Sequence, residues 1–191
     1  MSEMVARTGR HQQRYEEGRR LVAGCIPFKY RNSHENGDNN SGKVVEVLMI
    51  NSTGGPGLLF PKGGWENDET VEEAARREAF EEAGVRGDIK EFLGHYHFRS
   101  RSHQDEFSPD GLCKAAMFAL FVKEELNSWP EQSTRTRQWL TIPEASKNCR
   151  HAWMREVLEK GFLKWHVVDA TRPEDEDDHR VAAIASPQEQ K

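Results

Sequence analysis

"PKGGWENDETVEEAARREAFEEAGV", residues 61–85, holds eight acidic side chains against three basic ones in 25 residues. From Thr70 to Ala83, small apolar residues recur at helical intervals, and Glu or Arg residues fill most of the remaining positions. Gly84 follows where a residue that ends a helix in a left-handed conformation is expected. The stretch therefore predicts a glycine-containing loop followed by one helix with a narrow apolar face.

Three glutamates of this helix share one face. Glu78, Glu81 and Glu82 stand at i, i+3 and i+4, about one turn apart. Like charges at this spacing destabilise a helix by a few tenths of a kcal/mol per pair, so either water solvates this face or a cation binds there. Clustered carboxylates suit hard divalent cations such as Mg²⁺. Arg77 could pair with one carboxylate and fix its orientation.

Residues before the helix extend this hypothesis. Gly63 and Gly64 permit a backbone turn that other residues resist, and a carbonyl oxygen there could complete a metal shell. Glu69 lies just before the helix, where its charge also favours the helix N-terminus. The charge of the segment therefore has both a structural and a metal-binding explanation.

The spacing of these residues resembles the Nudix box of the Nudix hydrolase family. Gly63 is followed after five residues by Glu69, and after a further seven by REAFEEAGV, residues 77–85. The family's specified positions are filled by Gly63, Glu69, Arg77, Glu78, Glu81, Glu82 and Gly84. Val85 is the expected aliphatic residue, whereas Ala79 replaces a usually larger aliphatic one, which affects packing more than chemistry.

The resemblance implies an α/β (α+β) fold, a Nudix-type α/β/α sandwich with a mixed β-sheet between helices. It also implies hydrolysis of a diphosphate linked to another moiety, with the catalytic residues Glu69, Arg77, Glu78, Glu81 and Glu82. By the same analogy the cofactor is Mg²⁺, or Mn²⁺, bound by Glu78, Glu81 and Glu82 together with Gly63 and Gly64. The general base is left open between Glu78 and Glu106, which lies in a polar loop.

Longer motifs resemble one branch of this family, the diphosphoinositol polyphosphate and diadenosine polyphosphate phosphohydrolases, particularly the plant members. The motifs are FPKGGWE, EEAGVRG, VKEELNSWPE and RTRQWL, and the likeness extends over residues 7–165, without the loop at residues 32–43. It implies a Mg²⁺-dependent pyrophosphohydrolase with a small anionic polyphosphate substrate. Lys62 departs from animal members of the branch, where glycine is usual, so the exact geometry of the pocket differs from theirs.

Two other functions stay open beside this one. A Nudix hydrolase of ADP-ribose, NADH or other nucleoside diphosphate derivatives would carry the same box. A non-catalytic module that binds phosphate would keep the fold, but such a module does not need the complete set of carboxylates present here.

A substrate with many phosphates requires cations in its pocket. The candidates, each of which could equally be an ordinary surface charge, are Arg10, Arg19, Arg20, Lys62, Lys114, Arg135 and Arg137. Arg20 and Lys62 are favoured, because Arg20 abuts the first expected strand and Lys62 directly precedes the glycine pair. Trp129 and Trp139 could stack on a nucleobase, although such residues more often belong to a core.

The rest of the chain predicts strands and a final helix. Apolar runs predict strands at residues 19–31, 44–50, 89–98, 113–122 and 137–142. Pro143 is well placed as the first residue of a helix, and helical periodicity continues over residues 144–166. We therefore expect a basic segment at residues 1–18, a Nudix domain at 19–168 with its box at 63–85, and an acidic, disordered tail at 169–191.

Composition narrows the remaining classes of function. A chain of 191 residues favours one domain with appended segments. The net charge of −5 argues against nucleic-acid binding, and the lack of a run of 18 apolar residues argues against a membrane span. The three cysteines lack the spacing of a disulfide framework or a zinc site. We expect the protein in the cytoplasm and, in one interpretation, also in the nucleus. A mitochondrial location is the minority interpretation. The oligomeric state is left open.

Overall fold

The structure is a computed structural model that describes residues 13–32, 42–100 and 110–171. Arg10, Glu106, the loop at residues 33–41 and the tail from residue 172 onward lie outside the described residues. The predictions made for them therefore stay predictions.

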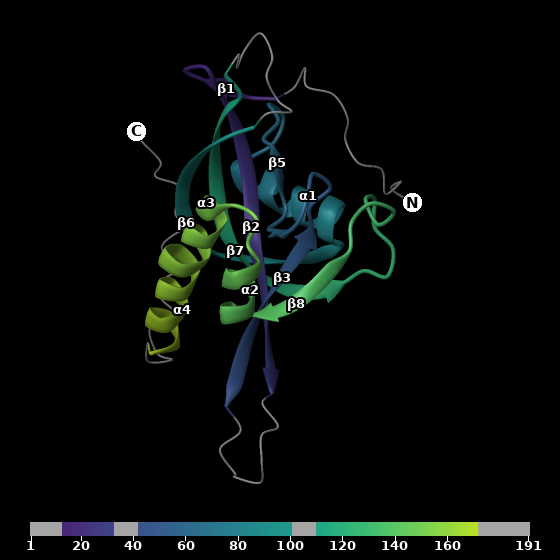
Figure 1. The fold of residues 1–191 in the computed structure, drawn as a ribbon, viewed down its shortest axis with the longest axis vertical. Coiled ribbons are helices and arrows are strands. Elements are labelled where there is room, and N and C mark those ends of the chain that lie inside the picture. The colour runs from purple at the N-terminus through teal and green to yellow at the C-terminus, as the bar shows by residue number, and fades with distance from the viewer. Residues whose placement is uncertain (1–12, 33–41, 101–109, 172–191) are drawn as a thin grey trace, which may run out of the picture.

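An eight-stranded β-sheet forms the centre of the fold (Figure 1). Its main strands follow the order β4 (Leu58–Leu59), β3 (Lys43–Asn51), β2 (Arg19–Asn32), β7 (Leu112–Glu125) and β6 (Val85–Arg99). The shorter strands β1 (Tyr15–Glu16) and β5 (Lys62–Gly64) pair with β2, and β8 (Arg137–Thr141) pairs with β3. Because β2 and β7 are parallel and the other pairs are antiparallel, the expected mixed sheet is confirmed.

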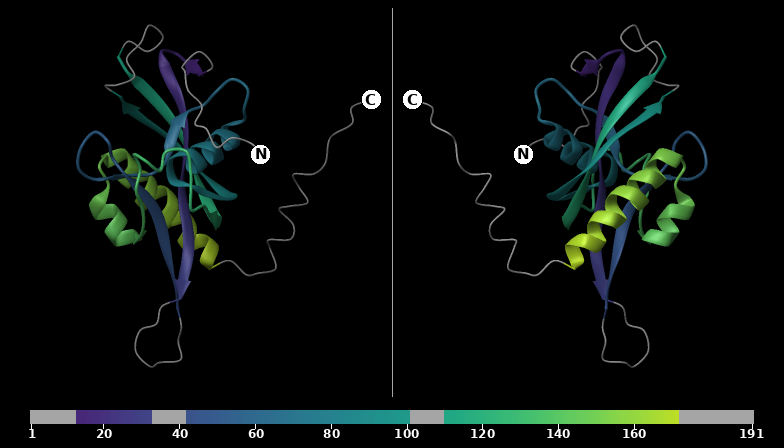
Figure 2. Two further views of the ribbon diagram at one scale, coloured as in Figure 1. Left: turned by 90° about the vertical axis from the view of Figure 1, so that its right-hand side faces the viewer. Right: turned by 90° about the vertical axis from the view of Figure 1, so that its left-hand side faces the viewer.

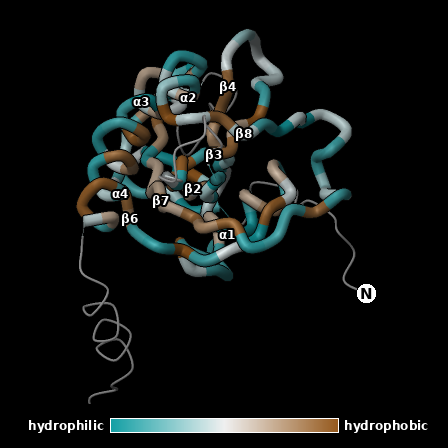
Figure 3. The backbone as a smooth tube through the Cα atoms, turned by 90° about the horizontal axis from the view of Figure 1, so that it is seen from below, coloured by the Kyte–Doolittle hydropathy of each residue, from teal (hydrophilic) through white to brown (hydrophobic). Residues whose placement is uncertain are grey.

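Helices cover both faces of this sheet. One face packs α1 (Val71–Ala83) against a cluster that includes Leu48, Phe118 and Leu120. The other face carries α2 (Ile142–Asn148), α3 (Ala152–Glu156), the π-helical segment η1 (Val157–Phe162) and α4 (Leu163–Ala170). Figure 3 shows α1 on one side of the strands, with α2 and α3 on the other. The predicted sandwich of helices around a mixed sheet is therefore confirmed.

The helix of the opening segment has the predicted ends. Thr70 begins α1 with a capping box, in which its hydroxyl accepts from Glu73 N and its backbone N–H donates to the Glu73 carboxylate. Gly84 ends the helix in the left-handed region, at φ 63°. The apolar face consists of small residues that are fully buried, Ala74, Ala75, Ala79 and Ala83. Small side chains let the helix backbone lie close to the sheet, which brings its glutamates near β5.

The single helix expected over residues 144–166 is wrong, because the chain breaks between α2 and α3. At the break, Arg150 N donates to Leu58 O at 2.9 Å, and Cys149 forms a parallel bridge with Leu58. The Arg150 guanidinium donates to Pro56 O at 2.8 Å and to Gly54 O at 3.0 Å. These bonds to β4 and to the loop before it hold the chain at the break. None of the helices in the described part of the chain is long and apolar enough to cross a membrane.

Three short strands were not predicted from the sequence, β1, β4 and β5. They are two or three residues long, so periodicity cannot reveal them, and each depends on a partner elsewhere in the chain. β1 pairs with the start of β2, so the proposed boundary at residue 18 falls within a hairpin. Figure 2 shows the opposite end of β2, together with β3, extending beyond the helices.

Candidate active site

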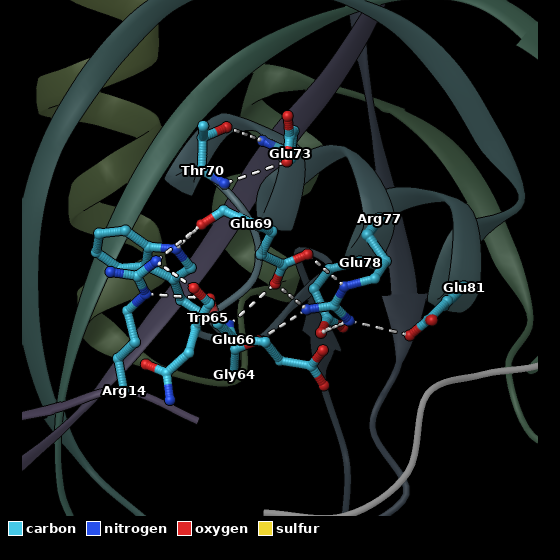
Figure 4. Close-up of polar contacts among 11 residues, drawn as sticks. Arg14, Gly64, Trp65, Glu66, Glu69, Thr70, Glu73, Arg77, Glu78 and Glu81 are labelled. Atoms are coloured by element: carbon cyan, nitrogen blue, oxygen red, sulfur yellow. Dashed lines mark hydrogen bonds and ion pairs between the residues drawn. The ribbon is translucent and has the colours of Figure 1, made fainter. Parts of the chain in front are cut away.

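The guanidinium of Arg77 lies at the centre of a group of carboxylates beside α1 (Figure 4). Arg77 Nε donates to Glu69 Oε2 at 3.0 Å, and Nη2 donates to Glu69 Oε1 at 2.7 Å, so the two side chains form a bidentate ion pair. Nη2 also donates to Gly64 O at 2.8 Å. One side chain thus joins the helix, the loop before it and β5.

Arg77 also contacts two of the three glutamates expected to bind metal. Its Nη1 donates to Glu78 Oε1 at 2.8 Å and to Glu81 Oε2 at 3.3 Å. Glu78 and Glu81 are only 7% and 6% exposed, so water screens these contacts little. Burial alone would lower the pKa of Arg77, but Glu69, Glu78 and Glu81 outweigh it and raise that pKa. Arg77 therefore stays charged and holds both carboxylates in fixed positions.

Glu82 is held from two other segments of the chain. Lys62 N, on β5, donates to Glu82 Oε2 at 3.1 Å. Arg135 Nη2 lies 3.6 Å from Glu82 Oε1, and its Nη1 donates to Asn51 O at 2.8 Å. The last turn of α1 is thereby tied to β5, to the end of β3 and to the loop before β8.

Two of the glutamates have raised pKa values. Burial raises the pKa of Glu78 to about 8, where the charge of Glu82 adds to the rise and Arg77 opposes it. Burial raises the pKa of Glu82 to about 7 against the charges of Lys62 and Arg135. The pKa of the fully buried Cys25 thiol is also raised, by burial and then by these two glutamates. The nearby cations thus compensate the burial of these carboxylates only in part.

The two glycines of the box make room for polar side chains. A Cβ atom at Gly63 would collide with the carboxylate of Glu78. A Cβ atom at Gly64 would lie 2.7 Å from the Gln13 amide and 2.9 Å from Arg20 Nη2. Only a residue without a side chain lets β5 pass this close to both groups.

The donor chemistry of this group fits a hard divalent cation, which binds carboxylate and carbonyl oxygens. Glu78 and Glu82 supply buried carboxylates, and it is chiefly this burial that raises their pKa values. Within residues 13–32, 42–100 and 110–171, no three His, Cys, Asp or Glu side chains are arranged to hold a metal ion. Glu81 contacts Arg77, and Glu82 contacts Lys62 and Arg135, so a cation shared by all three glutamates would compete with these contacts.

Of the two favoured phosphate contacts, Lys62 lies beside these carboxylates and Arg20 lies near Lys62. Arg20 is 6% exposed, and its Nε donates to Gln13 Oε1 at 2.6 Å. Burial lowers the pKa of Lys62, with Glu82 opposing this effect and Arg20 adding to it. The ammonium of Lys62 also lies 5.2 Å from the centre of the Phe98 ring. Positive charge is therefore concentrated immediately next to the carboxylate group.

The structure places the other expected cations differently. Arg19 contacts Glu17 at the β1–β2 turn, 3.6 Å away, and Lys114 is half-buried near the start of β7. The guanidinium of Arg137 does not point at the carboxylates, because it donates to the backbone carbonyl oxygens of Ala83, Gly84 and Leu126. Of the predicted cations within the described residues, Lys62 and Arg135 are therefore the ones placed beside the glutamates, with Arg20 near Lys62.

The two tryptophans considered as nucleobase contacts are both engaged with cations. The Arg137 guanidinium lies 4.2 Å from the centre of the Trp129 ring. The Lys29 ammonium lies 4.1 Å from the centre of the Trp139 ring, and the Trp139 indole N–H donates to Glu125 Oε1 at 2.7 Å. Stacking on a nucleobase would have to displace these side chains or use the opposite ring face.

Sequence reasoning missed Arg14, which holds the loop in front of α1. Its guanidinium lies 4.3 Å from the centre of the Trp65 ring and donates to the carbonyl oxygens of Glu66, Asn67 and Glu69. The Trp65 indole N–H donates to the same Glu69 carbonyl at 2.9 Å. The only signal in the sequence is a basic residue before the first strand, which does not reveal a partner 55 positions away in the chain.

Comparison with known proteins agrees with this geometry. Residues 37–161 match the family described as NUDIX domain. The chain is 70% identical over 166 residues to "Nudix hydrolase 16, mitochondrial" of Arabidopsis thaliana, across 87% of this chain and 92% of that protein. It is 32% identical over 149 residues to "Diphosphoinositol polyphosphate phosphohydrolase 3-alpha" of Mus musculus, across 75% and 79% of the two chains.

Solved structures extend the agreement to the fold. A NUDIX hydrolase from Nitrosomonas europaea superposes with a TM-score of 0.53 at 15% identity, across 82% of this chain and 98% of that one. Nudix hydrolases use divalent metal ions such as Mg²⁺, in agreement with the carboxylate chemistry beside α1. The box, the mixed sheet and these similarities lead to one conclusion: the chain belongs to the Nudix hydrolase family.

Proposed function

We propose that this chain is a Mg²⁺-dependent pyrophosphohydrolase that cleaves the diphosphate of diphosphoinositol polyphosphates and also accepts diadenosine polyphosphates. One observation carries the proposal: Lys62 lies directly beside the buried carboxylates of Glu78 and Glu82, and the buried Arg20 lies near Lys62. A substrate dense in phosphate needs such charge next to the group that hydrolyses it. The similarity to the mouse diphosphoinositol polyphosphate phosphohydrolase supports the same class.

The residues of the site would divide the work as follows. Glu78, Glu81 and Glu82 would hold Mg²⁺, or Mn²⁺, with the backbone at Gly63 and Gly64 alongside. When bound, the cation would neutralise phosphate oxygens and make water more acidic for in-line attack on phosphorus. Arg77 and Glu69 would keep the carboxylates in place, and Arg20 and Lys62 would bind the substrate phosphates. Arg10, Arg19, Lys114 and Arg137 stay weaker candidates for the same contact.

The base that takes a proton from the attacking water is most simply assigned to Glu78. Its carboxylate is buried against Gly63 and oriented by Arg77 Nη1 at 2.8 Å, within the group that would hold the cation and its water. Glu106 lies outside the described residues and remains the alternative base.

A panel of substrates tests the proposal. Purified protein with Mg²⁺ should release phosphate from a diphosphorylated inositol polyphosphate faster than it cleaves ADP-ribose or NADH. Glu82→Gln should remove this activity, and Glu72→Gln, on the same helix but outside the group, should keep it. Strong preference for ADP-ribose with an inert inositol substrate would overturn the choice of substrate. Full activity of Glu82→Gln would overturn the role of the glutamates, and no turnover of any substrate would favour a phosphate-binding module.

We also propose a mitochondrial location, in place of the cytoplasmic and nuclear ones expected from composition. The name of the similar Arabidopsis protein, "Nudix hydrolase 16, mitochondrial", supports it, and residues 1–31 carry seven Lys or Arg against three Glu. Plant cells that express the chain fused to a fluorescent protein at its C-terminus should show the fusion in mitochondria. A diffuse signal through cytoplasm and nucleus would restore the earlier expectation.

A further inference from the structure

The last turn of α1 carries Glu81 and Glu82 and has no basic residue of its own. A helix C-terminus exposes carbonyl oxygens and a partial negative charge, which cations nearby stabilise. In this fold the loop between β7 and β8 supplies hydrogen bonds, and Arg137 at the start of β8 supplies the charge. Backbone N–H groups of this loop donate to the helix end, from Glu131 to Glu81 O at 3.0 Å and from Leu126 to Gly84 O at 2.8 Å.

Trp129 of the same loop and Arg137, the first residue of β8, complete the attachment. The Trp129 indole N–H donates to Glu82 O at 3.2 Å. Arg137 Nη1 donates to Ala83 O and Gly84 O, both at 3.0 Å, and its Nη2 donates to Leu126 O at 2.7 Å. Because the guanidinium also lies 4.2 Å from the Trp129 ring centre, the two side chains hold the helix end as one unit.

The fit of this Arg137–Trp129 pair on the helix end is tight. A Cβ atom at Gly84 would lie 2.7 Å from Arg137 Nη1 and 2.7 Å from Trp129 Cδ2. A glycine is thus needed at position 84 both for its left-handed conformation, at φ 63°, and for the space that the pair occupies. Any shift of the pair would move the backbone of the turn that carries Glu82.

We propose that Arg137 and Trp129 are positioning residues, which fix the last turn of α1 so that Glu81 and Glu82 can bind a divalent cation. The inference rests on the proposed function of these glutamates. It assigns Arg137 a role through the helix backbone rather than through the substrate phosphates. The pair acts on carbonyl groups of the ligand-bearing turn, at a distance from the carboxylates themselves.

Binding of Mn²⁺, measured by electron paramagnetic resonance without substrate, tests this role. Arg137→Lys keeps the positive charge but loses the planar guanidinium that donates to several carbonyl oxygens at once. It should raise the Mn²⁺ dissociation constant about tenfold. Trp129→Phe keeps a ring under Arg137 and loses only the indole N–H, and should raise it about threefold. Arg86→Gln is the matched control, because Arg86 is an exposed arginine that also packs on an aromatic ring near α1, 4.7 Å from the centre of the Phe80 ring. This variant should bind Mn²⁺ with wild-type affinity.

The other results each have a definite meaning. Wild-type Mn²⁺ affinity in both folded variants overturns the positioning role and leaves the proposed function intact. A higher KM for the inositol substrate with unchanged Mn²⁺ affinity also overturns it, because Arg137 would then contact phosphate. Failure of the wild-type protein to bind Mn²⁺ overturns the inference together with the metal site of the proposed function. If Arg137→Lys does not fold by circular dichroism, Trp129→Phe alone decides.

Discussion

Arg77 and Glu69 form a bidentate ion pair, with hydrogen bonds of 3.0 and 2.7 Å, although eight positions separate them in the sequence. Glu69 lies before α1 and Arg77 lies two turns into it. The pair therefore bends the chain entering the helix back against the helix itself. The other end of the same guanidinium fixes Glu78 and Glu81, so the fold and the site depend on one side chain.

Replacement of Arg77 should therefore cost more stability than replacement of an ordinary surface arginine. Arg77→Gln leaves three buried carboxylates without their shared cation and should lower the free energy of unfolding by about 3 kcal/mol. Arg76→Gln is the control, because Arg76 directly precedes Arg77 in the sequence and is exposed. Its loss should change the free energy of unfolding by less than about 0.5 kcal/mol. Urea unfolding followed by circular dichroism measures both. Equal effects of the two substitutions would contradict the central position of Arg77.

The stability of the metal-free protein should fall as pH rises. Glu78 and Glu82 have folded-state pKa values of about 8 and about 7, above the ordinary value of 4.5, so both bind protons more tightly when folded. Their favourable contribution is complete below about pH 4.5 and is lost as pH rises through about 7 and 8.

Glu78→Gln isolates this effect, because glutamine stays neutral at every pH. Relative to wild type, the variant should gain stability steadily between about pH 5 and about pH 9 in the presence of EDTA. Thermal unfolding at each pH measures the difference. A difference that does not change with pH would mean that the pKa of Glu78 is not raised.

Gly63→Ala should strongly reduce activity without unfolding the protein. The added methyl group would collide with the Glu78 carboxylate and displace it, and a misplacement of this size costs about a hundredfold in kcat. Gly54→Ala is a suitable control, since the nearest atom to its new Cβ lies 3.8 Å away. Steady-state kinetics with the inositol substrate measures both variants. Normal kcat for Gly63→Ala would show that Glu78 has room to move.

Lys62→Gln should weaken binding of a highly phosphorylated substrate more than catalysis. The loss of one cation beside Arg20 should raise KM about tenfold, with a smaller rise for substrates that carry fewer phosphates. Lys123→Gln should have no such effect, because Lys123 is exposed near Asp88, at 3.9 Å. An equal rise in KM for all substrates would argue that Lys62 acts on the site as a whole and not on particular phosphates.

The sequence predicts α1 and its glutamates well because both are local. Helical geometry alone decides that Glu78, Glu81 and Glu82 share a face, and Thr70 and Gly84 mark the ends within the same short stretch. What the sequence could not predict depends on partners far along the chain. Arg14 holds the loop before α1 and Arg150 breaks the final helix, in each case through carbonyl groups more than fifty positions away.

Arg137 illustrates the same limit for function. Its charge suggested a phosphate contact, because a sequence shows that a side chain is positive but not where it points. The structure directs the guanidinium to backbone carbonyls at the end of α1. Lys62, by contrast, was favoured for its place before a glycine pair, and its backbone N–H does donate to Glu82 Oε2; its role toward substrate, and that of Arg20 nearby, stays a prediction.

The parallel pairing of β2 with β7 has a consequence for how the chain folds. β2 is the strand to which β1, β3, β5 and β7 all attach, but β7 follows only after α1 and β6 have been made. On the ribosome, the edge of β2 that β7 will cover stays open until most of the domain has been synthesised. Such long-range pairings fold slowly and expose strand edges to aggregation. We therefore expect truncations before β7 to aggregate, and refolding from urea to proceed slowly.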